Sequence, residues 1–193
     1  MCGRYQFTVE QCAEILQIAQ AVERRYGSGA WLPGEIHPTA SAPVLISSKG
    51  SISPELLSWG YKMPGKLVIN ARAETVAEKP MFRASVASQR CVIPSTGFYE
   101  WDEQKHKYLF TLSGEDALYI AGLYSVRDGK PCYCILTTAA NDSMREVHHR
   151  MPLVLERKQI APWLEQPEMA SDFLHMTPPA LVRTAADSQI RLW

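Results

Sequence analysis

Many short apolar segments, separated by Pro, Gly and Ser, limit the folds that this chain can adopt. The segments follow the stretch YGSGAWLPG and read APVLIS, KLVIN, RCVIP, KYLFTL, ALYIAGLY, CYCILTT and PLVL. Runs of this length and spacing are typical of strands in a sheet or barrel. We therefore expect an α+β fold with a β-rich, sheet- or barrel-like core and a few flanking helices. A chain of 193 residues has the length of one domain, which we assign to residues 1–193.

Three segments have helical patterns. The stretch TVEQCAEILQIAQ combines a capping-box pair, Thr8 and Gln11, with apolar residues at helical spacing. NDSMREV predicts a short helix capped by Asn141 or Asp142, which must end before RMP because a residue preceding proline favours an extended conformation. ERKQIAPWLEQP predicts a further short helix.

Charge and apolar patterning restrict the location and the partners. Lys plus Arg and Asp plus Glu number 20 each, so any surface that binds phosphates must come from clustering of cations. No apolar run approaches the roughly 20 residues of a membrane helix, and no signal peptide is evident. We expect a cytoplasmic monomer that has no membrane partner and is nucleoid-associated when bound to DNA.

The five cysteines are an odd number in a chain without secretory features, which favours reduced thiols. Cys132 and Cys134 form a C-x-C pair, but the second half of a zinc site is missing. Two thiols packed on one strand face are the better interpretation. We expect neither a metal nor a cofactor, and no nucleotide-binding or hydrolase elbow motif occurs.

The segment MCGRY places a cysteine at the second position. Cys2 is either simply the residue after the start codon or, once Met1 is removed, a residue with a free α-amine and a thiol on adjacent carbons. Few other positions in a protein offer these two nucleophiles together.

Three further segments have the residue types of a reaction site. In INARAET, a continuing strand would point Asn70, Arg72 and Glu74 to one face, although an ordinary solvent-exposed face explains the pattern as well. In GFYEW, Glu100 lies between aromatic residues. It is either at the surface, which the local sequence favours, or buried with a raised pKa that suits proton transfer. HHRMP has two imidazoles, which titrate near neutral pH.

Together and in this order, the segments MCGRY, SWGYKMP, INARAET, RCVIPSTGFYEW and HHRMP resemble the SOS response-associated peptidase (SRAP) family. The motifs cover about residues 2–155. The resemblance implies the β-rich SRAP fold and a positively charged groove for single-stranded DNA. It also implies a function in DNA damage: a covalent protein–DNA crosslink, a thiazolidine, to abasic sites, which shields the lesion from strand cleavage.

Residue by residue, the resemblance makes Cys2 the crosslinking nucleophile and Asn70 the residue that holds the reacting end. Glu100 resembles the family's catalytic acid or base, and His148 its catalytic histidine, with His149 at the variable position. The arginines that would bind DNA are Arg4, Arg72, Arg150 and, as a weaker addition, Arg83. Trp59, Phe98 and Tyr99 offer stacking surfaces for neighbouring bases, although core packing is the expected role of at least two of them. One departure is that WGYKMPGK lacks the second Trp that often follows in the family, which affects how the chain wedges against bases.

Two alternatives remain open at this point. Cys2, with His148 or Glu100 as its base, is compatible with a thiol hydrolase or autopeptidase that removes its own leader residue, and the family also suggests lyase activity. The aromatic and arginine residues alone would suffice for a module that binds single-stranded DNA without a covalent bond.

Overall fold

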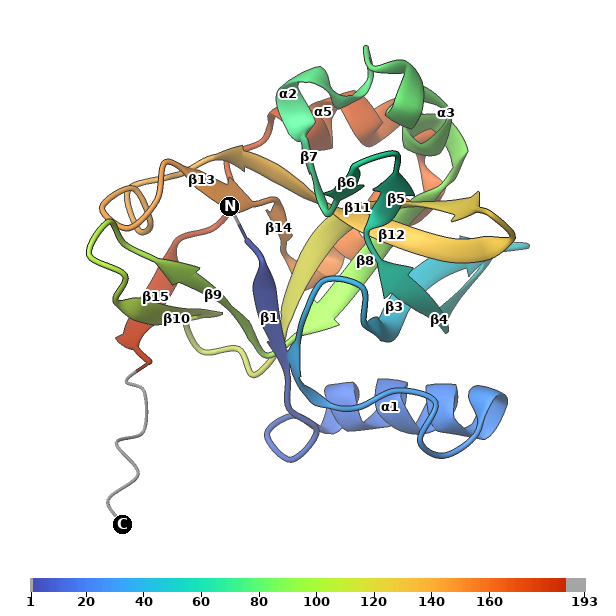
Figure 1. Cartoon of the computed structure of the whole chain (residues 1–193), viewed down its shortest axis with the longest axis horizontal. Helices are drawn as coiled ribbons and strands as arrows, with labels where there is room; N and C mark the ends of the chain where they lie inside the picture. The colour runs from blue at the N-terminus through green and yellow to red at the C-terminus, as the bar shows by residue number, and fades with distance from the viewer. Residues whose placement is uncertain (1, 187–193) are drawn as a thin grey trace.

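The computed structural model describes residues 2–186, which form a β-rich structure with helices at its periphery (Figure 1). The first eight strands are β1 (Arg4–Phe7), β2 (Gly34–Ile36), β3 (Ser41–Ser48), β4 (Ser51–Trp59), β5 (Tyr61–Met63), β6 (Lys66–Val68), β7 (Asn70–Arg72) and β8 (Arg90–Ser95). The others are β9 (Gly97–Trp101), β10 (Lys107–Leu112), β11 (Leu118–Arg127), β12 (Lys130–Ala139), β13 (Arg150–Pro152), β14 (Val154–Leu155) and β15 (Leu181–Ala185). The helices are α1 (Ala13–Tyr26), α2 (Ala73–Val76), α3 (Pro80–Ser88), α4 (Ile160–Glu165) and α5 (Ala170–His175), with 3-10 turns at Arg157–Gln159 and Pro167–Met169.

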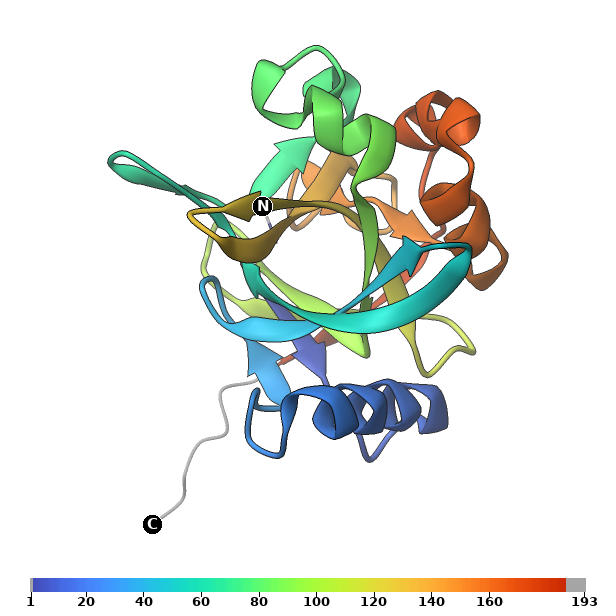
Figure 2. The ribbon, with the colours of Figure 1, turned by 90° about the vertical axis from the view of Figure 1, so that its right-hand side faces the viewer.

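Five strands close on themselves into a barrel. Strand β3 pairs with β4 and β8, β11 pairs with β8 and β12, and β12 completes the ring by pairing with β4. The last pairing is parallel and the other four are antiparallel. Figure 2 gives a view into this ring. The expected α+β class with a β-rich, barrel-like core is therefore confirmed, and each apolar segment named above contributes to a strand.

A second, antiparallel sheet lies beside the barrel in the order β15-β10-β9-β1-β2. Aromatic side chains join the two. The hydroxyl groups of Tyr5 on β1 and Tyr133 on β12 are 2.7 Å apart, and both residues are buried. Trp59 packs against both rings, stacked on Tyr133 and tilted against Tyr5. These contacts fix the start of β1, and hence the N-terminal segment, over the barrel.

Helix α1 buries Ile15, Ile18, Ala19 and Val22 along one face, as its apolar spacing predicts. It begins only at Ala13, however, and its N-cap Cys12 makes no side-chain capping bond, so the Thr8–Gln11 capping box is wrong. The physical reason is that the Thr8 backbone N–H is held by the hydroxyl of Thr96, which keeps this segment with the sheet.

The segment NDSMREV forms turns and not the expected helix. Asn141 does cap it, since its Oδ1 accepts a hydrogen bond from the Ser143 backbone N–H. Only two backbone hydrogen bonds here have helical i to i−4 spacing, from Arg145 to Asn141 and from His148 to Met144. Because the residues between them make none, no regular helix forms. The helix expected within ERKQIAPWLEQP is confirmed as α4. No helix within residues 2–186 has the length and apolarity needed to cross a membrane.

Candidate active site

Strand pairing brings the four sequence motifs together at one end of β1. Cys2 lies two residues before the start of β1, which pairs with β9, the strand that carries Glu100. Asn70 begins β7, which lies parallel to β12, and His148 lies in the loop just before β13, also a partner of β12. The candidate catalytic residues therefore come from both sheets and meet where the sheets adjoin.

Asn70 holds the backbone of Cys2. Its Nδ2 donates a 2.9 Å hydrogen bond to the Cys2 carbonyl oxygen. Its Oδ1 is buried and has no hydrogen-bond partner among residues 2–186. Buried polar atoms are nearly always paired, so this acceptor is suited to a donor that a ligand or a reacting group supplies.

The Cys2 side chain has no exposed surface, and its Sγ is 3.6 Å from the carbonyl oxygen of Arg4. Burial, and next the negative charge of Glu100, raise the pKa of the Cys2 thiol to about 12. The thiol is therefore neutral at physiological pH in this environment. A reaction here that needs sulfur must also have a group that accepts the thiol proton.

Glu100 is buried, with 5% of its surface exposed. Strand β9 alternates so that Phe98 and Glu100 face inward while Tyr99 and Trp101 are half-buried on the other face. The surface position that the local sequence favours is therefore wrong, because the Glu100 side chain is buried. The carboxylate acts electrostatically on the Cys2 thiol and on His148.

His148 is half-buried, and its Nδ1 is 2.9 Å from the backbone N–H of Arg150, which donates to it. The same Nδ1 is 3.1 Å from the Arg150 carbonyl oxygen and donates to it in the tautomer that carries the ring proton there. Burial lowers the pKa of His148 below its ordinary value, which favours the neutral form at pH 7. The His149 ring stacks on His148 with centroids 4.4 Å apart and an angle of 21° between planes.

Arg4 is partly exposed at the edge of the site and belongs to a cluster that sequence reasoning missed. Its Nη1 donates to Glu35 at 2.8 Å, and its guanidinium lies over the Trp101 ring. Lys107 donates to the same carboxylate at 2.7 Å and lies over Tyr99. The outward positions of Tyr99 and Trp101 could have been found from strand alternation in GFYEW, but Glu35 and Lys107 carry no local signal.

The Arg150 side chain is bound by other residues of the same chain. Its two terminal nitrogens donate to the carboxylate of Glu74 at 2.6 and 2.8 Å, and Nη2 also donates to the Thr137 carbonyl. This pairing lowers the pKa of Glu74 to about 2. The expected phosphate contact of Arg150 does not agree with this arrangement. The strand also does not continue to Glu74 as expected, because β7 ends at Arg72 and α2 begins at Ala73.

The other predicted DNA-binding residues differ in exposure. Arg72 and Arg83 are exposed, and Arg83 makes a long hydrogen bond to the Glu78 carbonyl. Trp59 has no exposed surface, and its Nε1 donates to the Ile69 carbonyl. Stacking of Trp59 on a base is therefore incompatible with this conformation, because the indole already packs between strands.

The cysteines outside the site are not arranged as metal ligands. Cys132 and Cys134 lie on β12, and both are buried. Burial raises the pKa of both thiols. Across the part of the chain that the structure describes, no group of three or more His, Cys, Asp or Glu residues is placed to hold a metal ion.

Comparisons with known proteins agree on one family. The sequence model of the family described as SOS response associated peptidase (SRAP) matches residues 1–190. The abasic site processing protein YoqW of Bacillus subtilis is 32% identical over 197 residues, covering 90% of this chain and 84% of that protein. The abasic site processing protein YedK of Escherichia coli is 26% identical over 180 residues, covering 86% of this chain and 80% of that protein.

Solved structures show the same fold. A crystal structure of a Bordetella bronchiseptica protein has a TM-score of 0.75 and 24% identity, covering 96% of this chain and all of that chain. A Bacteroides thetaiotaomicron protein has a TM-score of 0.76 and 22% identity, covering 97% of this chain and 93% of that one.

Proposed function

This chain belongs to the SOS response-associated peptidase (SRAP) family, and we propose that it processes abasic sites in single-stranded DNA by forming a covalent crosslink to them. The proposal depends mainly on where Cys2 lies. Its carbonyl oxygen accepts a hydrogen bond from Asn70, and the charge of the buried Glu100 acts on its thiol. The relatives named above, which are called abasic site processing proteins, support it.

The reaction begins once Met1 has been removed, because only then is the α-amine of Cys2 free. The reference pKa of an α-amine is about 8, so a usable neutral fraction exists at pH 7. An abasic deoxyribose opens to an aldehyde. The amine adds to the aldehyde carbon, and loss of water leaves a Schiff base between the Cys2 nitrogen and the sugar C1.

The thiol completes the adduct. The Cys2 sulfur adds to the imine carbon while its proton passes to the nitrogen, closing a five-membered thiazolidine with one new C–S bond. Because amine and thiol are on the same residue, ring closure is intramolecular and strongly favoured. The raised pKa of the thiol fits this order, in which the amine reacts first and the neutral thiol follows.

Glu100 and His148 transfer the protons. As the sugar ring opens, the Glu100 carboxylate takes the proton that the C1 hydroxyl loses and passes it to the ring oxygen; during dehydration it passes a proton from the attacking amine to the leaving hydroxyl. His148, neutral with a lowered pKa, accepts a proton on the other side of the reacting carbon. Asn70 orients the Cys2 backbone throughout, and its free Oδ1 accepts from the new α-amine.

The single-stranded DNA binds along the surface that carries exposed cationic side chains around this site. Arg4 and Arg72 take flanking phosphates as charge-assisted contacts, and Arg83 extends the same surface. Trp101 and Tyr99 provide half-buried aromatic faces beside Arg4. Arg150 acts indirectly, since its pairing with Glu74 fixes the loop that carries His148.

A denaturing gel tests the proposal. The mature protein is mixed with two oligonucleotides of one sequence, intact and abasic, and we expect a shifted band with the abasic strand only. A complex that forms with both strands and is lost on denaturation would identify a non-covalent binding module and overturn the proposal. Intact-mass measurement checks that the chain used begins at Cys2.

A further inference from the structure

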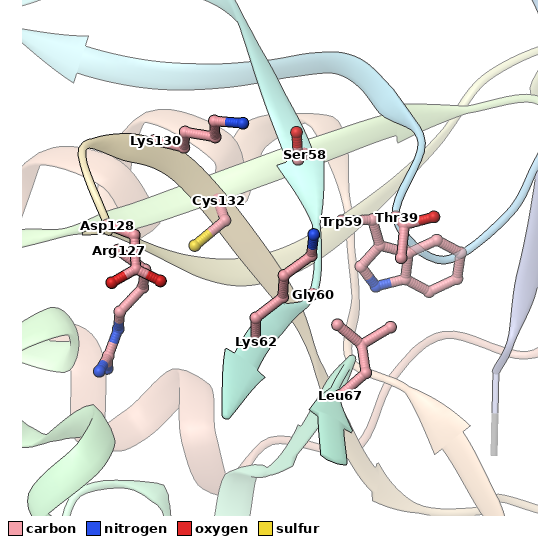
Figure 3. A pocket seen from close by; sticks show the side chains of 10 residues that line it. All are labelled: Thr39, Ser58, Trp59, Gly60, Lys62, Leu67, Arg127, Asp128, Lys130 and Cys132. Carbon is pink, nitrogen blue, oxygen red and sulfur yellow. The ribbon is translucent and has the colours of Figure 1, made fainter. Parts of the chain in front are cut away.

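A pocket of about 320 Å³ is lined in part by Trp59 (Figure 3). It is formed where β4 ends, where the β5–β6 hairpin begins, and where the tight turn joins β11 to β12. No residue assigned to the crosslinking chemistry lines it. The pocket therefore requires an explanation of its own.

Positive charge is concentrated at this pocket, although the whole chain has a net charge of zero. Lys62 comes from β5, and Arg127 and Lys130 come from the two ends of the β11–β12 turn. Asp128 is the one acidic residue among those that line the pocket, which leaves a local excess of positive charge. Lys62 and Lys130 extend from opposite sides, with Ser58 and Cys132 between them (Figure 3).

The interior of the pocket is largely apolar. Gly60, Leu67 and the buried Cys132 contribute to its lining. Gly60 has φ = +112°, and a Cβ at this position would lie 2.8 Å from the Leu67 side chain. Only glycine is tolerated here, and its missing side chain leaves the wall open. Cationic edges around an apolar interior match a nucleotide, which joins the flat π-face of a base to a phosphate.

Arg127 is held in place before any ligand arrives. Its Nη2 donates to the Met81 carbonyl at 3.3 Å, and its guanidinium lies over the Tyr61 ring. Its Nε is buried without a hydrogen-bond partner among the described residues. An unpaired buried donor is unfavourable, so an anion bound nearby would be favoured.

The pocket adjoins the site through a short chain of contacts. Trp59 lines the pocket and donates to the Ile69 carbonyl, and the next residue, Asn70, holds the Cys2 backbone. A strand bound at Cys2 and continuing past Trp59 would therefore reach Lys62.

We propose that this pocket binds one nucleotide of the DNA strand beside the abasic site. The backbone phosphate lies between Lys62 and Lys130, and the base enters the apolar interior beside Leu67. The inference rests on the proposed function, because it requires that the chain binds single-stranded DNA. It gives the strand a second anchor that is separate from the crosslinking residues.

The experiment uses the full chain with the double substitution Lys62→Ala/Lys130→Ala. Two exposed cations remote from the pocket, on α1 and on the β3–β4 turn, give the matched control Arg24→Ala/Lys49→Ala. Each protein is bound to abasic oligonucleotides of increasing length, from the lesion with its nearest neighbours to long strands, at several salt concentrations.

For long strands, we expect the Lys62/Lys130 variant to bind more weakly and to lose about 0.7 from the slope of log affinity against log salt, the contribution of the one phosphate that the two lysines neutralise. For the shortest abasic strand, affinity and crosslink yield should equal those of the wild type. The control variant should behave as the wild type at every length.

Unchanged affinity and slope on long strands would overturn the inference, and so would an equal loss at every length. A failure of the proposed function would look different, because the wild type itself would then give no crosslink with the shortest abasic strand.

Discussion

The side-chain amide of Asn70 donates a 2.9 Å hydrogen bond to the backbone carbonyl of Cys2, a residue 68 positions earlier in the chain. This bond turns the end of the chain, where fraying is usual, into a fixed part of the site. The α-amine that forms when Met1 is removed is attached to the same residue. Its direction therefore depends on Asn70.

Replacing Asn70 with alanine should slow crosslinking without abolishing it. A lost hydrogen bond to a buried carbonyl costs about 1–3 kcal/mol, which corresponds to a rate loss of about 5- to 150-fold. Single-turnover crosslinking, followed on denaturing gels, measures the rate. Asn70→Asp keeps the size but removes the donor and should be slow as well. An Asp variant as fast as the wild type would exclude the positioning role.

Glu100→Gln should slow crosslinking by about 10²- to 10⁴-fold, because it keeps the shape and removes the proton-transfer group. Affinity for intact single strands should hardly change. The nearby, exposed Glu103→Gln is the matched control and should crosslink normally. If circular dichroism shows that Glu100→Gln is unfolded, the carboxylate has a structural role instead.

The fold class could be predicted from the apolar runs because each run is short and bounded by turn residues. The closure of the barrel could not, since it depends on the parallel pairing of β12 with β4, in which Cys132 lies opposite Ser58. No local pattern encodes a partner that far along the chain. Only the resemblance to known sequences placed Cys2, Asn70, Glu100 and His148 in one site.

Side-chain partners were the least predictable part of the site. Arg150 looks like a phosphate ligand from its motif, yet Glu74 occupies its guanidinium. Trp59 looks like a stacking residue, yet it is wholly buried. In both cases the deciding contact joins residues distant in sequence, and the sequence pattern shows residue type without showing burial. Arg4, which is partly exposed, is paired with Glu35, which no motif marks.

The Glu74–Arg150 pair should make the free energy of unfolding depend on pH in the acidic range. The pKa of Glu74 is lowered to about 2 by Arg150, so its contribution is fully present above the unfolded pKa of about 4.3 and is lost as pH falls towards 2. Glu74→Gln should be less stable than the wild type near pH 7 by about 1 kcal/mol or less, because the carboxylate is partly exposed.

Urea unfolding across this pH range measures the effect. The difference between Glu74→Gln and wild type should shrink as the pH is lowered below about 4. Glu78→Gln, at an exposed position nearby, is the control and should show no such difference. A difference that stays constant down to low pH would mean that Glu74 does not act through its charge.

Salt should weaken the encounter with DNA more than it weakens the finished crosslink, because phosphate contacts release counterions and the covalent ring does not. Arg4→Ala should reduce the slope of log affinity against log salt by about 0.7 on single strands. Glu35→Gln should act in the opposite direction and tighten binding, since Glu35 competes with phosphate for Arg4 and Lys107. If the wild type, Arg4→Ala and Glu35→Gln bind DNA equally well, Arg4 does not contact the phosphates.

The order of the two bond-forming steps can be tested with Cys2→Ala in a chain whose first residue is then alanine. Its α-amine remains, so it should still form a Schiff base with the abasic aldehyde. Its thiol is absent, so no thiazolidine can close. Borohydride reduces imines and should trap a covalent complex with this variant, whereas the unreduced complex should fall apart on a denaturing gel.

The wild-type protein should remain crosslinked on the same gel without any reductant, because the C–S bond closes the ring intramolecularly. An unreduced Cys2→Ala complex that is equally stable would show that another residue, such as a lysine, forms the bond. Loss of even the borohydride-trapped complex, with binding to intact strands preserved, would mean that the thiol attacks first. That result would also conflict with the burial that raises the pKa of the Cys2 thiol to about 12 and leaves the amine as the better initial nucleophile.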